Sequence, residues 1–140
     1  MRVVFDTNVV LDVLLERKPY LQDAATLFAA VEHGWFTGLL CATTITTVYY
    51  IGSQKHGRAL VHKKLKDLLA MFTVAPVTHP ILVEALQLDF SDFEDAVLHE
   101  TAAAADAHGI VTRNEKDFQR SRLRIYSPAE LVAVLRALHQ

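Results

Sequence analysis

Short apolar runs of strand length alternate with longer segments of helical period along the whole chain. A short run rich in branched and aromatic side chains is typical of a buried strand, whereas apolar residues at every third or fourth position indicate a helix with one buried face. This alternation predicts an α/β fold in which a parallel sheet is flanked by helices. The predicted strands are Val3–Phe5, Phe36–Cys41, Thr73–Val77, Ile110–Thr112 and Arg124–Tyr126.

The helical segments are bounded by residues that interrupt or stop helices. Pro19 separates the first two, because proline cannot sit in a continuing helix interior, and Gly34 and Gly57 are suitable stops. The stretch Thr43–Val48 is rich in β-branched residues and looks like a strand locally. Tyr49 and the polar tail after it extend a helical period, so we predict a helix opened by Thr43 or Thr44. The predicted helices are Val9–Leu15, Tyr20–His33, Thr43–His56, Arg58–Phe72, His79–Leu88, Phe93–Asp106 and Pro128–Leu138.

Length and composition favour one well-packed domain over residues 1–140. The chain has 140 residues, of which 51% are hydrophobic, so it can bury a core without disulfides. Its single cysteine, Cys41, excludes an internal disulfide and favours a reducing, cytoplasmic setting. No signal peptide is visible, and no apolar stretch has the ~18–20 residues of a membrane span, so we expect no membrane partner.

Charge is distributed unevenly, although the formal net charge is only −2. Basic residues cluster at 55–66 and again at 113–124, while acids concentrate between Asp89 and Asp106. Local basic zones are compatible with contacts to a phosphate backbone, and also with ordinary solvated helix faces, which charge alone favours. Charge does not exclude either interpretation.

Acidic residues stand at the end of one predicted strand and at the start of one predicted helix. Asp6 directly follows the first strand, and ligands of open α/β sheets sit outside the carboxyl ends of strands. Asp92, Glu94 and Asp95 open the helix that leads into the strand at 110–112. The alternative is that these acids only cap helices, since the N-terminus of a helix favours negative charge by ~0.3–1 kcal/mol.

The strand at 110–112 ends in Thr112 and is followed by the polar residues Asn114 and Asp117. If this strand is a neighbour of the strand at 3–5, the acids named above lie close to these residues. Several carboxylates in one cleft repel one another unless a cation joins them, and oxygen ligands of this kind select Mg²⁺ or Mn²⁺. Such an ion supports hydrolysis of phosphodiesters. We find no Ser-His-Asp order and no glycine-rich phosphate loop. We predict surface or capping positions for the histidines His56, His62, His79, His99, His108 and His139.

Three motifs resemble those of the PIN-domain nucleases. The opening Val3–Leu15, with Asp6-Thr7-Asn8 inside it, is similar to the first motif, and Asp92–Ala96 and Val111–Phe118 are similar to the later ones. The Tyr49-Tyr50 segment resembles the VapC-like branch found among the toxins of bacterial toxin–antitoxin pairs. The resemblance spans nearly the whole chain. It implies a three-layer α/β/α sandwich with a small parallel sheet, a Mg²⁺- or Mn²⁺-dependent endoribonuclease, a homodimer, and a small antitoxin partner.

The resemblance also implies roles for particular residues. Asp6, Asp95 and Asp117 would be catalytic, and the metal would be held by Asp6 and Asp95, with Asp92, Glu94 and Asp117 beside them. Thr7, Asn8, Thr112 and Asn114 would position water or the RNA phosphate.

Two departures from the family pattern keep other functions open. Many relatives carry an acid in the helix after the second strand, where Thr43–Tyr49 has none, and many have an aspartate where Asn114 stands. A PIN-fold RNA- or protein-binding module with weakened catalysis is therefore one alternative. A phosphatase-like enzyme with Asp6 as nucleophile is another, although its usual second aspartate, two residues on, is replaced by Asn8.

Overall fold

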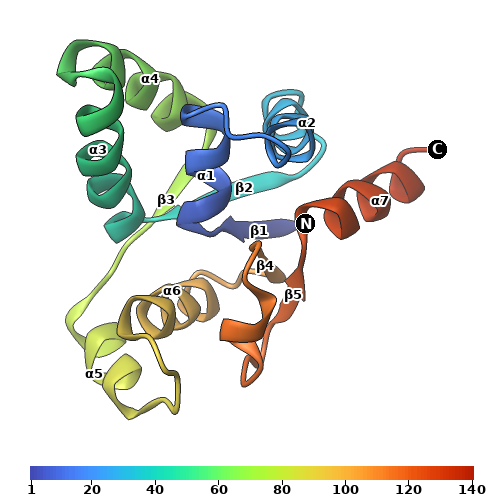
Figure 1. The fold of residues 1–140 in the computed structure, drawn as a ribbon. Coiled ribbons are helices and arrows are strands. Elements are labelled where there is room, and N and C mark those ends of the chain that lie inside the picture. Colours follow the sequence, from blue (N-terminus) through green and yellow to red (C-terminus); the bar gives the residue numbers. More distant parts are fainter.

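A five-stranded parallel sheet with helices on both faces forms the computed structural model, which describes residues 1–140 (Figure 1). The strands lie in the order β3-β2-β1-β4-β5, and every neighbouring pair is parallel. The α/β class expected from the sequence is confirmed. The strands are β1 (Arg2–Phe5), β2 (Thr37–Cys41), β3 (Thr73–Ala75), β4 (Gly109–Val111) and β5 (Arg124–Tyr126).

Seven α-helices and one 3₁₀-helix connect and cover the strands. None of the helices is both long enough and apolar enough to cross a membrane. They are α1 (Thr7–Leu14), α2 (Leu21–Glu32), α3 (Ala42–His56), α4 (Arg58–Met71), α5 (His79–Gln87), α6 (Phe93–Ala104), the 3₁₀-helix η1 (Glu115–Phe118) and α7 (Pro128–Leu138).

Most element boundaries agree with the predicted ones to within two residues, and the differences have local causes. Helix α3 is a helix despite its β-branched start, but Cys41 occupies its N-cap position rather than a threonine. Strand β3 stops at Ala75, because Pro76 lacks the backbone N–H that would extend the ladder. A 3₁₀-helix forms within the predicted loop after β4.

The side chains of β1 alternate between two cores, one on each face of the sheet. Val3 and Phe5 belong to a large core with residues of α1, α2, α4 and α7. Val4 belongs to a smaller core on the other face, which α6 covers. Phe5 packs edge to face on Phe28 and Phe72, with ring centroids 5.8 and 5.0 Å apart. This alternation, which follows from the two-residue period of a strand, produces the three layers.

The order of the strands reverses at β1. The chain passes from β1 to β2 and β3 on one side, and then returns to place β4 and β5 on the other side. Strands β1 and β4 pair in register, Phe5 opposite Val111, and the Asp6 amide N–H donates to the Val111 carbonyl at 2.9 Å. The residues that follow these two strands therefore meet at a topological switch point, where open α/β sheets bind their ligands.

Candidate functional site

A polar cavity of about 250 Å³ opens at the carboxyl ends of the central strands. It collects residues from four places in the sequence: the end of β1, the start of α3, the start of α6, and the segment around η1. Every residue predicted to be catalytic, to bind the metal or to position substrate lines this cavity except Thr112, which is fully buried behind Asp6. The lining residues are Asp6, Thr7, Asn8, Leu11, Thr43, Thr44, Thr47, Asp92, Glu94, Asp95, Leu98, Asn114 and Asp117.

Asp6 caps helix α1 and also faces the cavity, so it is both a helix cap and a residue of the candidate site. Its Oδ1 accepts a hydrogen bond from the Thr7 backbone N–H at 2.8 Å, and its Oδ2 accepts one from the Thr112 hydroxyl at 2.7 Å. Burial raises the pKa of Asp6, those two hydrogen bonds oppose the rise, and the charges of Glu94 and Asp117 add to it. The structure thus buries a carboxylate beside other acids.

Asp95 carries the most perturbed carboxyl group of the cavity. It lies in the first turn of α6, where its backbone N–H donates to the Oδ1 of the N-cap residue Asp92 at 3.1 Å. Burial first, and then the charges of Asp6, Asp92, Asp117 and Glu94, raise the pKa of Asp95 from 3.8 to about 7. Near neutral pH this group therefore exchanges its proton readily, and a cation that removed the repulsion would favour the ionised form.

Hydroxyl groups line the side of the cavity that is formed by α3. The Thr44 side chain is buried, with its Oγ1 3.1 Å from that of Thr7. The Thr47 hydroxyl is 3.3 Å from Glu94 Oε1, and this contact joins the second turn of α3 to the first turn of α6 across the cavity. Glu94 thereby brings a carboxylate to the wall formed by α3, which has no acid of its own. The sequence of Thr43–Tyr49 showed only that an acid is absent. It did not indicate that threonine hydroxyls line this side of the cavity.

The donor atoms of the cavity are carboxylate, hydroxyl and amide oxygens, which suit a hard divalent cation. No group of three or more His, Cys, Asp or Glu side chains is close enough together to hold a metal ion as they stand. Asp92 and Glu94 are exposed residues of the cavity lining, and each has one carboxylate oxygen engaged, by the Asp95 backbone N–H and by the Thr47 hydroxyl respectively. The residues present fit such an ion in chemistry, with Asp6 as the one acid whose position is fixed on both oxygens.

His99 corrects the expectation that the histidines of this chain are surface or capping residues. Its side chain is buried, with Nδ1 3.2 Å from Glu100 Oε1, and its Nε2 accepts a hydrogen bond from the Arg122 backbone N–H at 3.2 Å. Burial is possible because both ring nitrogens have partners. His99 does not line the acidic cavity.

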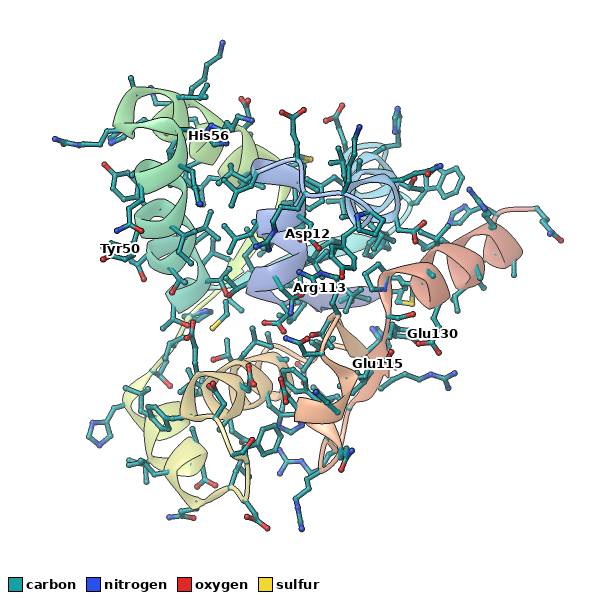
Figure 2. The ribbon with its side chains drawn as sticks, viewed as in Figure 1. Asp12, Tyr50, His56, Arg113, Glu115 and Glu130 are labelled. Carbon is teal, nitrogen blue, oxygen red and sulfur yellow. The ribbon has the colours of Figure 1, made fainter.

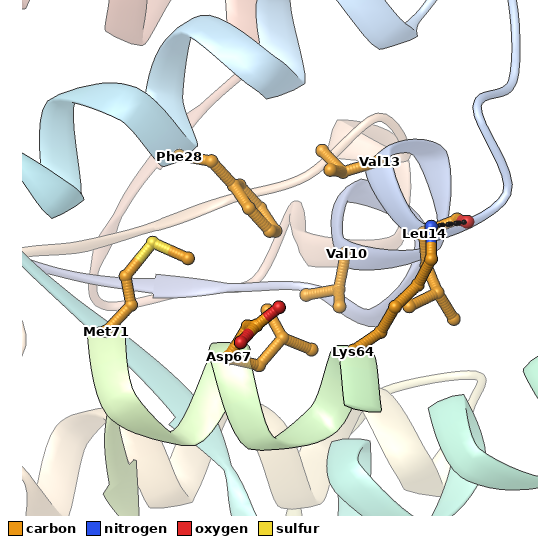
Figure 3. Close-up of a pocket in the computed structure, with 8 residues that line it drawn as sticks. Val10, Val13, Leu14, Phe28, Lys64, Asp67 and Met71 are labelled. Carbon is orange, nitrogen blue, oxygen red and sulfur yellow. Dashed lines mark hydrogen bonds between the residues drawn. The ribbon is translucent and has the colours of Figure 1, made fainter. Parts of the chain in front are cut away.

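A second cavity, of about 170 Å³, lies between α1, α2 and α4 and has a different character (Figure 3). Its lining is mostly apolar, including Val10, Phe28 and Met71, and the Lys64 ammonium at its edge donates to the Leu14 carbonyl at 3.4 Å. One acid, Asp67, lies among its lining residues. Converging acids distinguish the cavity at the strand ends as the candidate for hydrolytic chemistry.

The fold and the cavity together define a class of protein. The chain is an α/β protein whose carboxylates form one site at the switch point of a small parallel sheet. A family model described as PIN domain matches residues 2–116. The chain therefore belongs to the PIN domain family. A comparison with curated proteins found no match.

Several solved structures share this fold. A toxin–antitoxin complex from Klebsiella pneumoniae has a TM-score of 0.69 at 21% identity, over 90% of this chain and 97% of that one. FitAcB from Neisseria gonorrhoeae has a TM-score of 0.71 at 17% identity, over 91% and 98%. VapC20 from Mycobacterium tuberculosis, described as a Sarcin-Ricin loop cleaving toxin, has a TM-score of 0.64 at 13% identity, over 77% and 86%. At these identities the likeness establishes the fold alone.

Proposed function

We propose that the protein is a metal-dependent endoribonuclease and the toxin component of a toxin–antitoxin pair. The observation that carries the proposal is the convergence on one cavity of Asp6, which follows β1, with acids of α6 and η1. In this cavity the pKa of Asp95 is raised to about 7. Membership of the PIN domain family supports a nuclease, and the toxins among the proteins of similar fold support the biological role.

Asp6 and Asp95 are the proposed principal ligands of a Mg²⁺ or Mn²⁺ ion, and Asp117 is the third proposed catalytic acid. When bound, such an ion would lower the pKa of a water molecule and stabilise the leaving oxygen of a phosphodiester. Asp92 and Glu94 add negative charge at the cavity, which increases its affinity for a divalent cation. Thr7, Asn8, Thr112 and Asn114 are the proposed positioning residues: Thr112 and Asn8 donate to Asp6, and Asn114 and Thr7 line the cavity.

RNA is the proposed substrate, and the cavities around η1 indicate where its backbone would run. A second polar cavity, of about 260 Å³, shares Asp117 with the acidic cavity and includes Lys116 and Arg120. Cations at this position can hold the phosphates next to the one being cleaved. Of the two basic zones in the sequence, the one at 113–124 thus borders the site, while the basic residues of 55–66 do not line the acidic cavity.

A small antitoxin protein and a second copy of this chain are the proposed partners. The Klebsiella structure is itself a toxin–antitoxin complex, which supports an antitoxin for this chain. The decisive observations are co-purification of the two proteins after co-expression and the mass of the isolated chain by light scattering.

A binding module without useful activity is the second candidate. The acid-free wall of α3 and the lack of a ready-made cluster of metal-binding side chains favour it. Under that alternative the purified chain binds RNA but does not cleave it with either metal.

The test is to incubate the purified chain with RNA in Mg²⁺, in Mn²⁺ and in EDTA. We expect metal-dependent cleavage that Asp6→Asn or Asp95→Asn reduces by about a hundredfold or more, because each removes a charged oxygen ligand. Asp67→Asn changes an exposed acid of α4 that does not line the acidic cavity, so it is the matched control and should cleave like the unmodified chain. Cleavage that persists in EDTA, or full activity of Asp6→Asn, would exclude the proposed mechanism.

A further inference from the structure

A buried carboxylate lies behind the acidic cavity and is shared by two arginines. Asp12, on α1, has no exposed surface. Arg113 donates to it through Nε at 2.6 Å and through Nη2 at 3.2 Å, and Arg17 donates through Nε at 2.8 Å. Figure 2 shows Asp12 and Arg113 side by side between α1 and the end of β4. This cluster, Asp12 with Arg17 and Arg113, does not line the acidic cavity.

Both arginines of the cluster also hold Asn8. The Arg17 Nη2 group donates to the Asn8 backbone carbonyl at 3.2 Å. The backbone N–H of Arg113 donates to the side-chain Oδ1 of Asn8 at 3.3 Å. With its oxygen engaged in this way, the Asn8 side chain has to direct its NH₂ group to the opposite side.

On that opposite side the Asn8 Nδ2 group reaches Asp6 Oδ2 at 3.2 Å and Thr112 Oγ1 at 3.4 Å. The Thr112 hydroxyl donates to the same Oδ2 at 2.7 Å and accepts from the Asn114 backbone N–H at 3.0 Å. Asp6 Oδ2 thus accepts two hydrogen bonds and Oδ1 accepts one, from Thr7. Each carboxylate oxygen has about two lone-pair positions. Oδ1 of Asp6 therefore keeps one lone-pair position that accepts no hydrogen bond.

We propose that Asp12 and Arg113 are positioning residues, which orient Asn8 so that Asp6 presents Oδ1 to the cation of the proposed active site. The inference rests on the proposed function for the identity of that ligand, a divalent cation. The chain of contacts runs from the Asp12 carboxylate to the Arg113 guanidinium, which holds the Arg113 main chain in place. The backbone N–H of Arg113 then orients the Asn8 side chain, and Asn8 contacts Asp6.

Stability alone is a poor explanation for the cluster. Replacing a buried ion pair by apolar side chains of similar volume is often neutral or stabilising, so a purely structural role would not require these charges. Arg113 also stacks on the Tyr20 ring, with its guanidinium carbon 3.8 Å from the ring centroid. Arg113 is therefore fixed from two sides, by Asp12 and by Tyr20, as a residue that orients another has to be.

The double variant Asp12→Leu with Arg113→Met separates positioning from stability. We expect it to fold with nearly unchanged resistance to urea and to bind Mn²⁺ about tenfold more weakly by calorimetry, since residues that orient metal ligands contribute roughly 10–100-fold to affinity. Arg113→Lys keeps the charge and loses the two-pronged contact, and we expect a similar loss of affinity. This single variant decides the question should the double variant not fold.

A second measurement does not depend on any metal. In the unmodified chain the side-chain NH₂ resonances of Asn8 should be well separated and slow to exchange with water, and in both variants they should move together and exchange faster. Arg122→Met, which removes an arginine from another carboxylate, Glu100, is the matched control and should leave both Mn²⁺ affinity and these resonances unchanged. Folded variants with unaltered Asn8 resonances would overturn the inference. If the unmodified chain binds no Mn²⁺, the proposed function fails, while the Asn8 resonances still decide whether the cluster positions this side chain.

Discussion

The Thr112 hydroxyl donates a 2.7 Å hydrogen bond to Oδ2 of Asp6, and this bond joins the carboxyl ends of β4 and β1 across 106 positions of sequence. Both side chains are buried, Thr112 completely and Asp6 to within 7% of full burial. A buried carboxylate that loses such a donor has no solvent to replace it. The bond therefore links the sheet to the candidate site directly.

Replacing Thr112 by valine removes the hydroxyl and keeps the shape. We expect Thr112→Val to lower the free energy of unfolding by about 1.5–3 kcal/mol, as for other hydrogen bonds to charged groups, and to weaken Mn²⁺ binding about tenfold. Urea denaturation and calorimetry measure the two effects. Thr101→Val is the matched control, because the buried Thr101 hydroxyl has no partner and its loss should be neutral or stabilising. Equal effects of both substitutions would contradict the importance of the Asp6 contact.

The pKa of Asp95, raised from 3.8 to about 7, gives the metal-free protein a defined pH dependence. Between these values the folded state holds the proton more tightly than the unfolded state, so the free energy of unfolding falls as the pH rises from about 4 to about 7. Asparagine does not ionise. In EDTA, Asp95→Asn should therefore be more stable than the unmodified chain at about pH 8, and the difference should narrow toward about pH 4.

Urea denaturation at the two pH values measures this difference. Adding Mn²⁺ at the higher pH should reverse the order, because the cation stabilises only the chain that keeps its Asp95 carboxylate. An Asp95→Asn variant that is less stable at the higher pH without metal would show that the acids of the cavity do not repel one another as described.

The strand ends of the site could be predicted because their signals are local. An apolar run followed by Asp6-Thr7-Asn8 marks both the end of a buried strand and the cap of a helix, and residues 110–114 repeat the pattern. The pairing of β1 with β4 was only a condition of the sequence argument, because the expectation of a parallel sheet does not fix the order of its strands. The start of α3 was harder, because β-branched residues disfavour a helix locally and only packing against α1 and α4 decides in its favour.

The buried polar clusters could not be predicted because their partners are distant in sequence. Asp12 and Arg113 are 101 positions apart, and His99 and Arg122 are 23 apart. Aspartate and arginine usually lie on the surface and histidine is intermediate, so none of these residues indicates a buried cluster by itself. The one available signal was that Asp12 interrupts an otherwise apolar run from Val9 to Leu15, where a charge needs a partner.

Gly109 of β4 is required by the close approach of its neighbour β5. A Cβ at this position would lie 2.6 Å from the Arg124 backbone oxygen and 2.8 Å from the Tyr126 ring. We expect Gly109→Ala to lower the free energy of unfolding by at least the ~1–3 kcal/mol typical of overpacking, since a sheet backbone cannot move aside. Because β4 leads into Thr112, Mn²⁺ affinity should also fall.

Gly38→Ala is the matched substitution on the other side of β1. Its Cβ would meet the side chains of Phe72 and Val31, with no backbone atom among the nearest contacts. We expect a loss of stability here too, because the Phe72 ring is packed against Phe5 and Phe28, but unchanged Mn²⁺ affinity, because β2 carries no acid of the cavity. Urea denaturation and calorimetry of both variants test this, and equal losses of affinity would disprove the special position of β4.

The final prediction concerns the proposed path of RNA past η1. Lys116 and Arg120 line the polar cavity that shares Asp117 with the acidic cavity, and both are exposed. The ion pair of Arg120 with Asp89, at 3.3 Å, joins side chains that are 70% and 82% exposed, so it does not compete strongly with a phosphate. We expect Lys116→Gln with Arg120→Gln to raise KM for a short RNA several-fold and to leave kcat nearly unchanged, because neither residue lines the acidic cavity. Each lost phosphate contact should also reduce the slope of log affinity against log salt by about 0.7 for a single strand.

The charge-matched control is Lys63→Gln with Lys66→Gln, on the exposed face of α4. If this control raises KM and the pair at η1 does not, the RNA runs along α4 rather than past Asp117.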